Sequence, residues 1–159
     1  MTRGHRISRS LSLLLLSGIV SACATMEPAP SLYKRLTVVD ATGTPQAGRA
    51  AIALIVDDFV VVLVADPRVS GRFKSLPPAA VTKLKSNLSD QICEATGGPC
   101  SYLGRDMKTT HTGMRITEVE WNATVEDLVK ALDKHKIGAT EKSELLAILG
   151  PMRGDIVGR

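Results

Sequence analysis

ATGGPCSYLGRDMKTTHTGMRIT, residues 95–117, contains His111, one of only three histidines in the chain. The Gly97-Gly98-Pro99 run near its start is typical of a helix end. We expect residues 99–110 to form a loop with at most one helical turn. A lone histidine is usually not a metal ligand, so the residues alone leave the role of His111 open.

The composition indicates one globular domain with an aliphatic core. The chain has 159 residues, 44% of them hydrophobic, but only two Phe, two Tyr and one Trp. The formal charge of +4 falls to about +1 if Arg3, Arg6 and Arg9 leave with a cleaved leader. No basic patch interleaved with aromatic residues then remains, which argues against nucleic acid as a partner.

The N-terminus is typical of a secretory signal peptide. Residues 1–9 are basic, and the apolar run 11–20 is too short to span a bilayer comfortably. Val-Ser-Ala-Cys at 20–23 resembles a bacterial lipobox, which implies cleavage before Cys23 and its lipidation, so that the lipid anchors the protein to a membrane. The alternative is an ordinary signal peptide with a chance cysteine.

These features give three expected segments. Residues 1–22 form the lipoprotein signal peptide, 23–30 the lipidated Cys23 and a tether, and 31–157 the folded domain. Residue 24 is Ala rather than Asp, so the resemblance implies the periplasmic side of the outer membrane rather than the inner membrane.

Two further cysteines, Cys93 and Cys100, lie on either side of the Gly-Gly-Pro run. A continuous helix would hold them about 10 Å apart, too far for a disulfide, whereas a turn would bring them together. An oxidising compartment would favour the bond. The alternative is two small buried thiols.

The rest of the domain is predicted to be helical. Residues 50–65 contain VVVLVA, which alone would suit a buried strand, but Ile52, Val56, Phe59 and Leu63 recur at helical spacing. We therefore predict a helix that ends at Asp66-Pro67.

Further helices are expected from Pro77-Pro78 to Gly97, from the capping box at Thr117 and Glu120, and from residues 139–140 to Pro151. Residues 40–48, DATGTPQAG, are expected to be a turn-rich loop. Amphipathic helices without convincing strands predict an all-α domain.

Several blocks of the chain resemble group I truncated haemoglobins. They are SLYKRL (31–36), VDDFVVVLVADPRV (56–69), the opening block, VEDLVKALDKHKI (125–137) and ELLAILGPMRGDIV (144–157). The resemblance implies a two-over-two helical sandwich around haem, with the globin domain at 31–157. The insertion-like TVVDATGTPQAGRA departs from the family pattern.

The resemblance assigns His111 as the proximal ligand of a b-type haem iron, a role that suits a neutral imidazole. Without a Cys-x-x-Cys-His motif, we expect non-covalent haem. His135 lies between two lysines and is expected to be solvated. Lys85 and Arg105 are candidate partners for the haem propionates, but an exposed, solvated charge is the more common state of such side chains.

The remaining pocket residues follow from the same resemblance, and for each of them plain core packing is the alternative. They are Phe59, Val60, Phe73, Leu84, Leu88, Tyr102, Met107, Met114, Ile116, Trp121, Leu128 and Leu149.

The side of the haem opposite His111 departs from the family. Val60 stands where the family usually has a tyrosine whose hydroxyl hydrogen-bonds the bound gas, and Leu88 where it often has a glutamine. We expect weaker O₂ retention as a result. Asn87 and Thr124 are the nearest polar side chains.

Three functions are therefore weighed. The first is reversible binding of O₂, NO or CO by a five-coordinate haem, for oxygen binding or transport. The second is an NO dioxygenase that uses an external reductase, which is less favoured because the distal side lacks its donors. The third is a degenerate globin-fold lipoprotein without haem, against which the retained His111 block argues.

Overall fold

The computed structural model describes Met1 and residues 28–159. Residues 2–22 of the expected signal peptide, Cys23 and the tether as far as residue 27 therefore lie outside the described residues. Within the described part, the helices are too short or too polar to cross a membrane.

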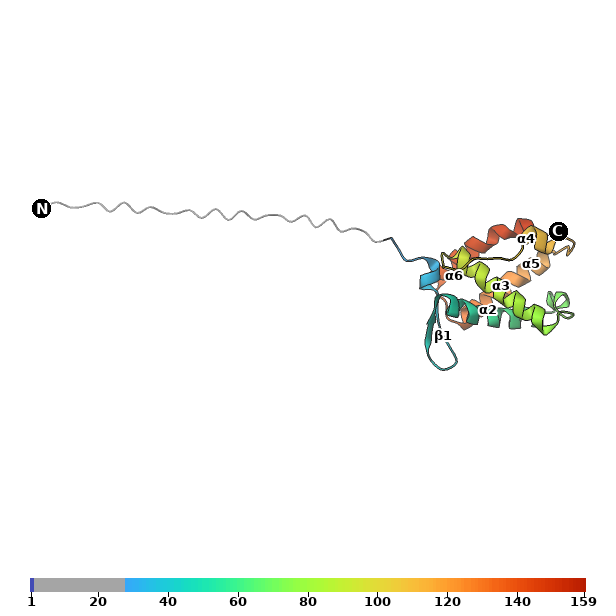
Figure 1. The fold of residues 1–159 in the computed structure, drawn as a ribbon, viewed down its shortest axis with the longest axis horizontal. Helices are drawn as coiled ribbons and strands as arrows, with labels where there is room; N and C mark the ends of the chain where they lie inside the picture. The colour runs from blue at the N-terminus through green and yellow to red at the C-terminus, as the bar shows by residue number, and fades with distance from the viewer. Residues whose placement is uncertain (2–27) are drawn as a thin grey trace.

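The described chain folds into helices with one small hairpin (Figure 1). Its elements are α1 (Leu32–Arg35), β1 (Thr37–Val39), β2 (Pro45–Ala47), α2 (Gly48–Ala65), the 3₁₀ turn η1 (Ser70–Arg72), α3 (Pro78–Ala95), α4 (Met107–His111), α5 (Glu118–Lys134), α6 (Ala139–Leu149), the 3₁₀ turn η2 (Gly150–Met152) and α7 (Arg153–Ile156).

Helix α2 is the centre of the fold, because it packs against both α3 and α5. The four residues predicted to form its apolar stripe are all buried: Ile52, Val56, Phe59 and Leu63. The helix ends where Asp66 takes an extended conformation before Pro67. The helical interpretation of this apolar run is confirmed.

The predicted helix ends are also present. Pro78 stands in the first turn of α3, where its missing N–H costs no hydrogen bond. The Thr117 hydroxyl accepts a hydrogen bond from the backbone N–H of Glu120 at 3.2 Å, and Glu120 Oε2 accepts one from the N–H of Thr117 at 2.8 Å. This capping box starts α5. Helix α6 gives way to a 3₁₀ turn at Pro151.

The loop expected at 40–48 is instead part of a hairpin, in which β1 pairs antiparallel with β2. Asp40 closes its turn: Oδ1 accepts the N–H groups of Thr42 and Thr44 at 2.9 and 3.0 Å. Hydrogen bonding, first from the Thr42 hydroxyl, lowers the pKa of Asp40 to about 2. The strands are too short for an alternating pattern to stand out, so the sequence predicted the turn but missed the pairing.

The two ends of the domain carry different parts of the chain. The hairpin and α1 lie at the end where residue 28 enters, and α4 and the C-terminus lie at the other (Figure 1). Helix α7 packs on α4. Beyond it, the N–H of Gly158 donates to the carbonyl of Ile116 at 2.8 Å, and the N–H of Arg115 donates to the carbonyl of Arg159. The C-terminal residues therefore brace the segment that follows His111.

Candidate functional site

His111 is the last residue of α4, a single short helix in a stretch that is otherwise irregular between residues 99 and 116. Asp106 caps this helix by accepting the backbone N–H of Thr109 at 2.8 Å, and that hydrogen bond lowers the pKa of the Asp106 carboxyl. Nδ1 of His111 lies 2.8 Å from the carbonyl oxygen of Met107. When Nδ1 donates to this carbonyl, Nε2 has no proton and presents its lone pair.

A single imidazole nitrogen, Nε2 of His111, suits haem iron as a ligand better than it suits a metal ion without a porphyrin. Among residues 28–159, no three His, Cys, Asp or Glu side chains come together as a metal site. A protein zinc site usually takes three or four such ligands. Haem iron needs only one proximal histidine, because the porphyrin supplies the in-plane nitrogens.

Tyr102 packs along the irregular segment that leads to α4. Its hydroxyl donates to the carbonyl of Arg105 at 2.8 Å, and burial raises the pKa of the phenol. A Cβ on Gly104 would lie 2.3 Å from the Tyr102 side chain, so only glycine lets the ring lie this close to the backbone. The Tyr102 hydroxyl is therefore held by its own loop.

A disulfide joins Cys93, near the end of α3, to Cys100, at the start of the same irregular segment. The two Cα atoms lie 5.7 Å apart. The chain reverses at Gly97, whose φ is +81°, and the N–H of Gly98 donates to the carbonyl of Cys93 at 2.8 Å. The sequence left open a disulfide or two buried thiols, and the structure has the disulfide. The bond joins α3 to the irregular segment that carries His111, residues 99–116 (the His111 segment).

The side chains predicted to face His111 across the pocket are apolar. Phe59 and Val60 are buried in α2, and Leu84 and Leu88 are half-buried one turn apart on α3. The Thr124 hydroxyl donates to the carbonyl of Glu120 in its own helix at 2.8 Å. This bond uses the only proton of that hydroxyl, so Thr124 is a poor candidate for the missing distal donor.

The twelve predicted pocket residues fall into two burial classes. Phe59, Val60 and Leu128 are buried in the core, while the other nine are only half-buried and none is fully exposed. Phe73, Leu88 and Leu149 pack against the core cluster. Six further half-buried residues lie outside the group that packs against this cluster: Leu84, Tyr102, Met107, Met114, Ile116 and Trp121. Most of these residues therefore keep part of their surface accessible, as contact with an apolar ligand requires.

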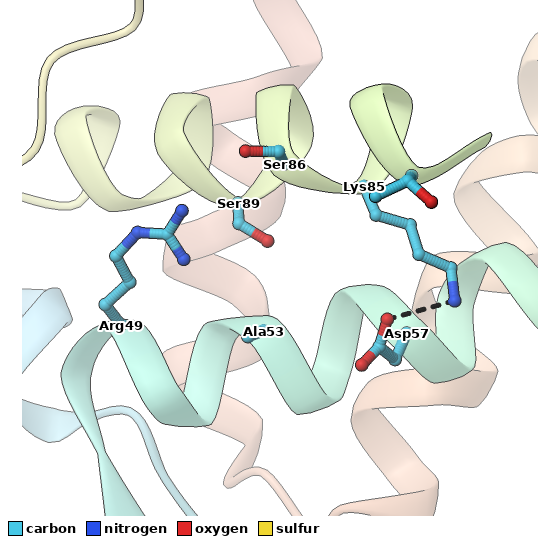
Figure 2. Close-up of a pocket in the computed structure, with 7 residues that line it drawn as sticks. Arg49, Ala53, Asp57, Lys85, Ser86 and Ser89 are labelled. Carbon is cyan, nitrogen blue, oxygen red and sulfur yellow. Dashed lines mark ion pairs between the residues drawn. The ribbon is translucent and has the colours of Figure 1, made fainter. Parts of the chain in front are cut away.

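Lys85 and His135 each lie beside a carboxylate of α2. The Lys85 ammonium lies 3.0 Å from Asp57 Oδ1, at a shallow hollow between α2 and α3 that none of the predicted pocket residues lines (Figure 2). The solvated state predicted for His135 is wrong. Its side chain is 10% exposed, with Nε2 2.8 Å from Asp58 Oδ2, because α2 covers the end of α5 there.

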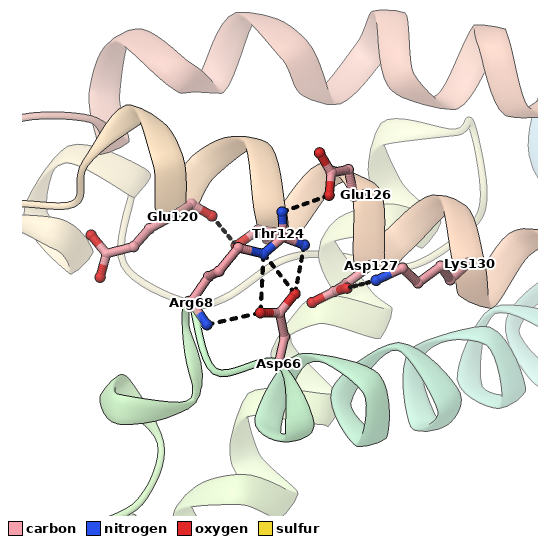
Figure 3. A network of polar contacts seen from close by, with 7 residues as sticks. All are labelled: Asp66, Arg68, Glu120, Thr124, Glu126, Asp127 and Lys130. Carbon is pink, nitrogen blue, oxygen red and sulfur yellow. Dashed lines mark hydrogen bonds and ion pairs between the residues drawn. The ribbon is translucent and has the colours of Figure 1, made fainter.

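A polar network that the sequence analysis missed fixes the end of α2 to α5 (Figure 3). The Arg68 guanidinium lies 2.6 Å from Asp66 Oδ2 and 2.7 Å from Glu126 Oε2. Hydrogen bonds from Arg68 lower the pKa of Asp66 to about 2. Further along α5, the buried Asp127 accepts a bond from Lys130 at 2.8 Å. The Asp-Pro-Arg order was the available signal, because an aspartate beside a helix-ending proline can hold an arginine two residues on.

A second missed contact involves Arg72, the last residue of η1. Its guanidinium donates to both carboxylate oxygens of Glu120, at 2.6 and 3.1 Å, and to the carbonyl of Met114 at 2.8 Å. No local spacing in the sequence indicates this contact, since its partners lie more than 40 residues away.

Comparison with known proteins agrees with this architecture. The family model described as bacterial-like globin matches residues 38–157. The group 1 truncated haemoglobin of Mycolicibacterium paratuberculosis is 29% identical over 130 residues, which cover 82% of this chain and 85% of the relative. That of Tetrahymena pyriformis is 27% identical and covers 80% of this chain and 100% of the relative.

The solved structures point the same way. The 2/2 haemoglobin of Synechococcus sp. PCC 7002, solved in the cyanomet state with covalently attached haem, is 29% identical with a TM-score of 0.68. The match covers 82% of this chain and 100% of that one. The iron(III) truncated haemoglobin of Tetrahymena pyriformis is 23% identical, with a TM-score of 0.69 and the same coverage, and supports the fold alone. The predicted two-over-two helical fold is confirmed. The chain therefore belongs to the bacterial-like globin family, in which its relatives are group 1 truncated haemoglobins.

Proposed function

We propose that this chain binds b-type haem non-covalently, with Nε2 of His111 as the protein ligand of the iron. The observation that carries the proposal is the contact of His111 Nδ1 with the Met107 carbonyl at 2.8 Å. A hydrogen bond of this kind fixes the tautomer and the ring orientation of metal-bound histidines. When bound, haem would supply an iron able to take up a diatomic gas such as O₂, NO or CO.

The half-buried apolar residues support the same assignment. Leu84 and Leu88 come from α3, and Met107 and Met114 from the His111 segment, so two separate parts of the chain offer apolar surface. Covering such surface with a porphyrin gains free energy in proportion to the apolar area removed from water. The work of the chain's residues is then to hold the haem, exclude water and leave the gas side open.

The absence of a donor at Val60 and Leu88 predicts weak retention of O₂. Bound O₂ carries partial negative charge, and a hydrogen bond to a charged group contributes about 1.5–3 kcal/mol. Losing it raises the dissociation constant roughly ten- to a hundredfold. We therefore propose reversible gas binding, for storage, delivery or sensing, as the principal function. Turnover of NO to nitrate with an external reductase is the second candidate, and stopped-flow mixing of the oxygenated protein with NO tests it.

The visible spectrum tests the haem assignment. The purified domain, titrated with haem, is expected to develop a Soret band whose position changes with CO. His111→Ala should lose or shift that band, whereas His135→Gln should keep it, because His135 contacts Asp58 instead. A wild-type protein without a Soret band would overturn the assignment, and so would a band that His111→Ala leaves unchanged. The first of these results would favour the haem-free lipoprotein.

For the N-terminus, we propose a lipid anchor at Cys23 that holds the domain at the periplasmic side of the outer membrane. The lipobox-like Val-Ser-Ala-Cys at 20–23 supports this proposal. Mass spectrometry of the N-terminal peptide from membrane fractions should find a diacylglyceryl Cys23, and Cys23→Ser should release the protein from the membrane. An unmodified Cys23 in soluble protein would contradict the proposal.

A further inference from the structure

Arg72 connects the loop between α2 and α3 that carries Phe73 (the Phe73 loop, residues 66–77) to the turn that follows His111 (the His111 turn, residues 112–114). It directly precedes Phe73, the aromatic residue expected against the haem. Its Nη1 donates to the carbonyl of Met114 at 2.8 Å. The N–H of Met114 in turn donates to the carbonyl of His111 at 3.0 Å, so Arg72 holds the turn immediately after the proposed iron ligand.

The second partner of Arg72 is itself firmly held. Glu120 is paired through two hydrogen bonds from the guanidinium, and its side chain is only 15% exposed. The same carboxylate accepts bonds from the N–H and the hydroxyl of Thr117, at 2.8 and 2.9 Å, in the capping box of α5. Arg72, followed by these bonds from Thr117, keeps the pKa of Glu120 at about 2, so the pair stays charged at neutral pH.

We propose that Arg72 is a positioning residue that fastens the Phe73 loop to the His111 turn and thereby slows the loss of haem. The inference rests on the proposed function, since it needs a bound haem that residues of both segments contact. Haem can leave only if the residues around it separate. Separation here requires breaking a forked carboxylate pair and a hydrogen bond to a backbone carbonyl at the same time.

A neighbouring ion pair provides the contrast. Arg153 of α7 pairs with Glu118 in the same first turn of α5, but both side chains are about half exposed, and the pair joins α5 to α7 rather than to the Phe73 loop. Exposed ion pairs of this kind contribute little. If any arginine–glutamate pair at this end of the domain affected haem retention, Arg153→Ala would act like Arg72→Ala.

The experiment measures the transfer of haem from the loaded protein to an excess of an apoglobin acceptor at pH 7. Arg72→Ala is expected to release haem about tenfold faster than wild type, the size expected from losing hydrogen bonds between charged groups. Arg72→Lys should recover part of the effect, because lysine keeps the charge but lacks the planar fork. Arg153→Ala should stay within about twofold of wild type.

A haem-free measurement separates positioning from general stability. Urea unfolding of Arg72→Ala, Glu120→Gln and the double variant as apoproteins gives the coupling between the two residues. The inference requires faster haem loss in Arg72→Ala than in a control variant that destabilises the apoprotein equally without touching Arg72 or Glu120, such as Asp40→Ala in the hairpin turn. If Arg72→Ala fails to fold, Arg72→Lys and Glu120→Gln take its place in the comparison.

Two results would overturn the inference. Haem loss from Arg72→Ala within twofold of wild type would do so and leave the haem assignment standing. Equal acceleration in Arg72→Ala and Arg153→Ala would do the same. A wild-type protein that takes up no haem would instead refute the proposed function, and the inference with it.

Discussion

Replacing Leu88 by glutamine is expected to restore a hydrogen-bond donor on the gas side of the pocket. Leu88 is half-buried on α3 and packs at the edge of the core, so a side chain of similar length fits with little rearrangement. Its partial exposure also means that the amide keeps some contact with water when no gas is bound. Val60 is a poorer position, because it is 2% exposed and a tyrosine there would overpack the core.

The size of the effect follows from two opposing contributions. A hydrogen bond to a charged acceptor contributes about 1.5–3 kcal/mol. Desolvating the amide costs about 1 kcal/mol at a half-buried position. The net gain of about 0.5–2 kcal/mol lowers the dissociation constant of O₂ roughly two- to thirtyfold. Most of that change should appear in the off-rate.

Stopped-flow displacement of O₂ by CO measures this off-rate. Leu88→Met is the matched control, because it conserves volume without adding a donor. We expect a slower off-rate in Leu88→Gln and an unchanged one in Leu88→Met. Equal off-rates in the two variants would refute the reasoning, as would a wild-type protein that already holds O₂ as firmly as tyrosine-bearing relatives.

Three further predictions concern stability. Replacing Cys93 and Cys100 by alanine should lower the free energy of unfolding by about 2–3 kcal/mol, since the disulfide closes a short loop in the unfolded chain; a denaturant titration that shows no loss would contradict this. Thr117→Ala should lower the free energy of unfolding by about 1 kcal/mol, because it removes the capping box, and the urea midpoint measures this loss. The melting temperature should fall as pH drops from 4.5 towards 2. The unfolded Glu120 takes its proton near pH 4.5 but the folded one only near 2, and Glu120→Gln should flatten that slope.

The sequence predicted those parts of the fold that depend on local patterns. The spacing of Ile52, Val56 and Phe59 decided between helix and strand in α2, because helical periodicity extended over more residues than a strand has. The capping box could be predicted equally well, since Thr117 and Glu120 lie within one helical turn of each other. The role of His111 stays a prediction, but its contact with the Met107 carbonyl adds an observation to it.

The features that escaped prediction depend on distant partners. His135 was expected in solvent because two lysines flank it, and only the packing of α2 beside it explains its burial. The hairpin of β1 and β2 pairs strands of three residues, too short to leave a periodic signal. Arg72 contacts residues 42 and 48 positions away, and nothing within its own segment indicates which carboxylate it meets.

The two ends of the domain are not equivalent as attachment points for a fusion tag or a solid support. The C-terminal residues are bonded to Arg115 and Ile116, directly after the His111 turn, and α7 packs on α4. A tag appended at Arg159 could therefore disturb the hydrogen bonds that hold the segment with the proposed iron ligand. Residue 28 enters at the opposite end, beside α1 and the hairpin (Figure 1). Spectroscopic or kinetic work on this protein is thus best done with the label or surface linkage upstream of the domain.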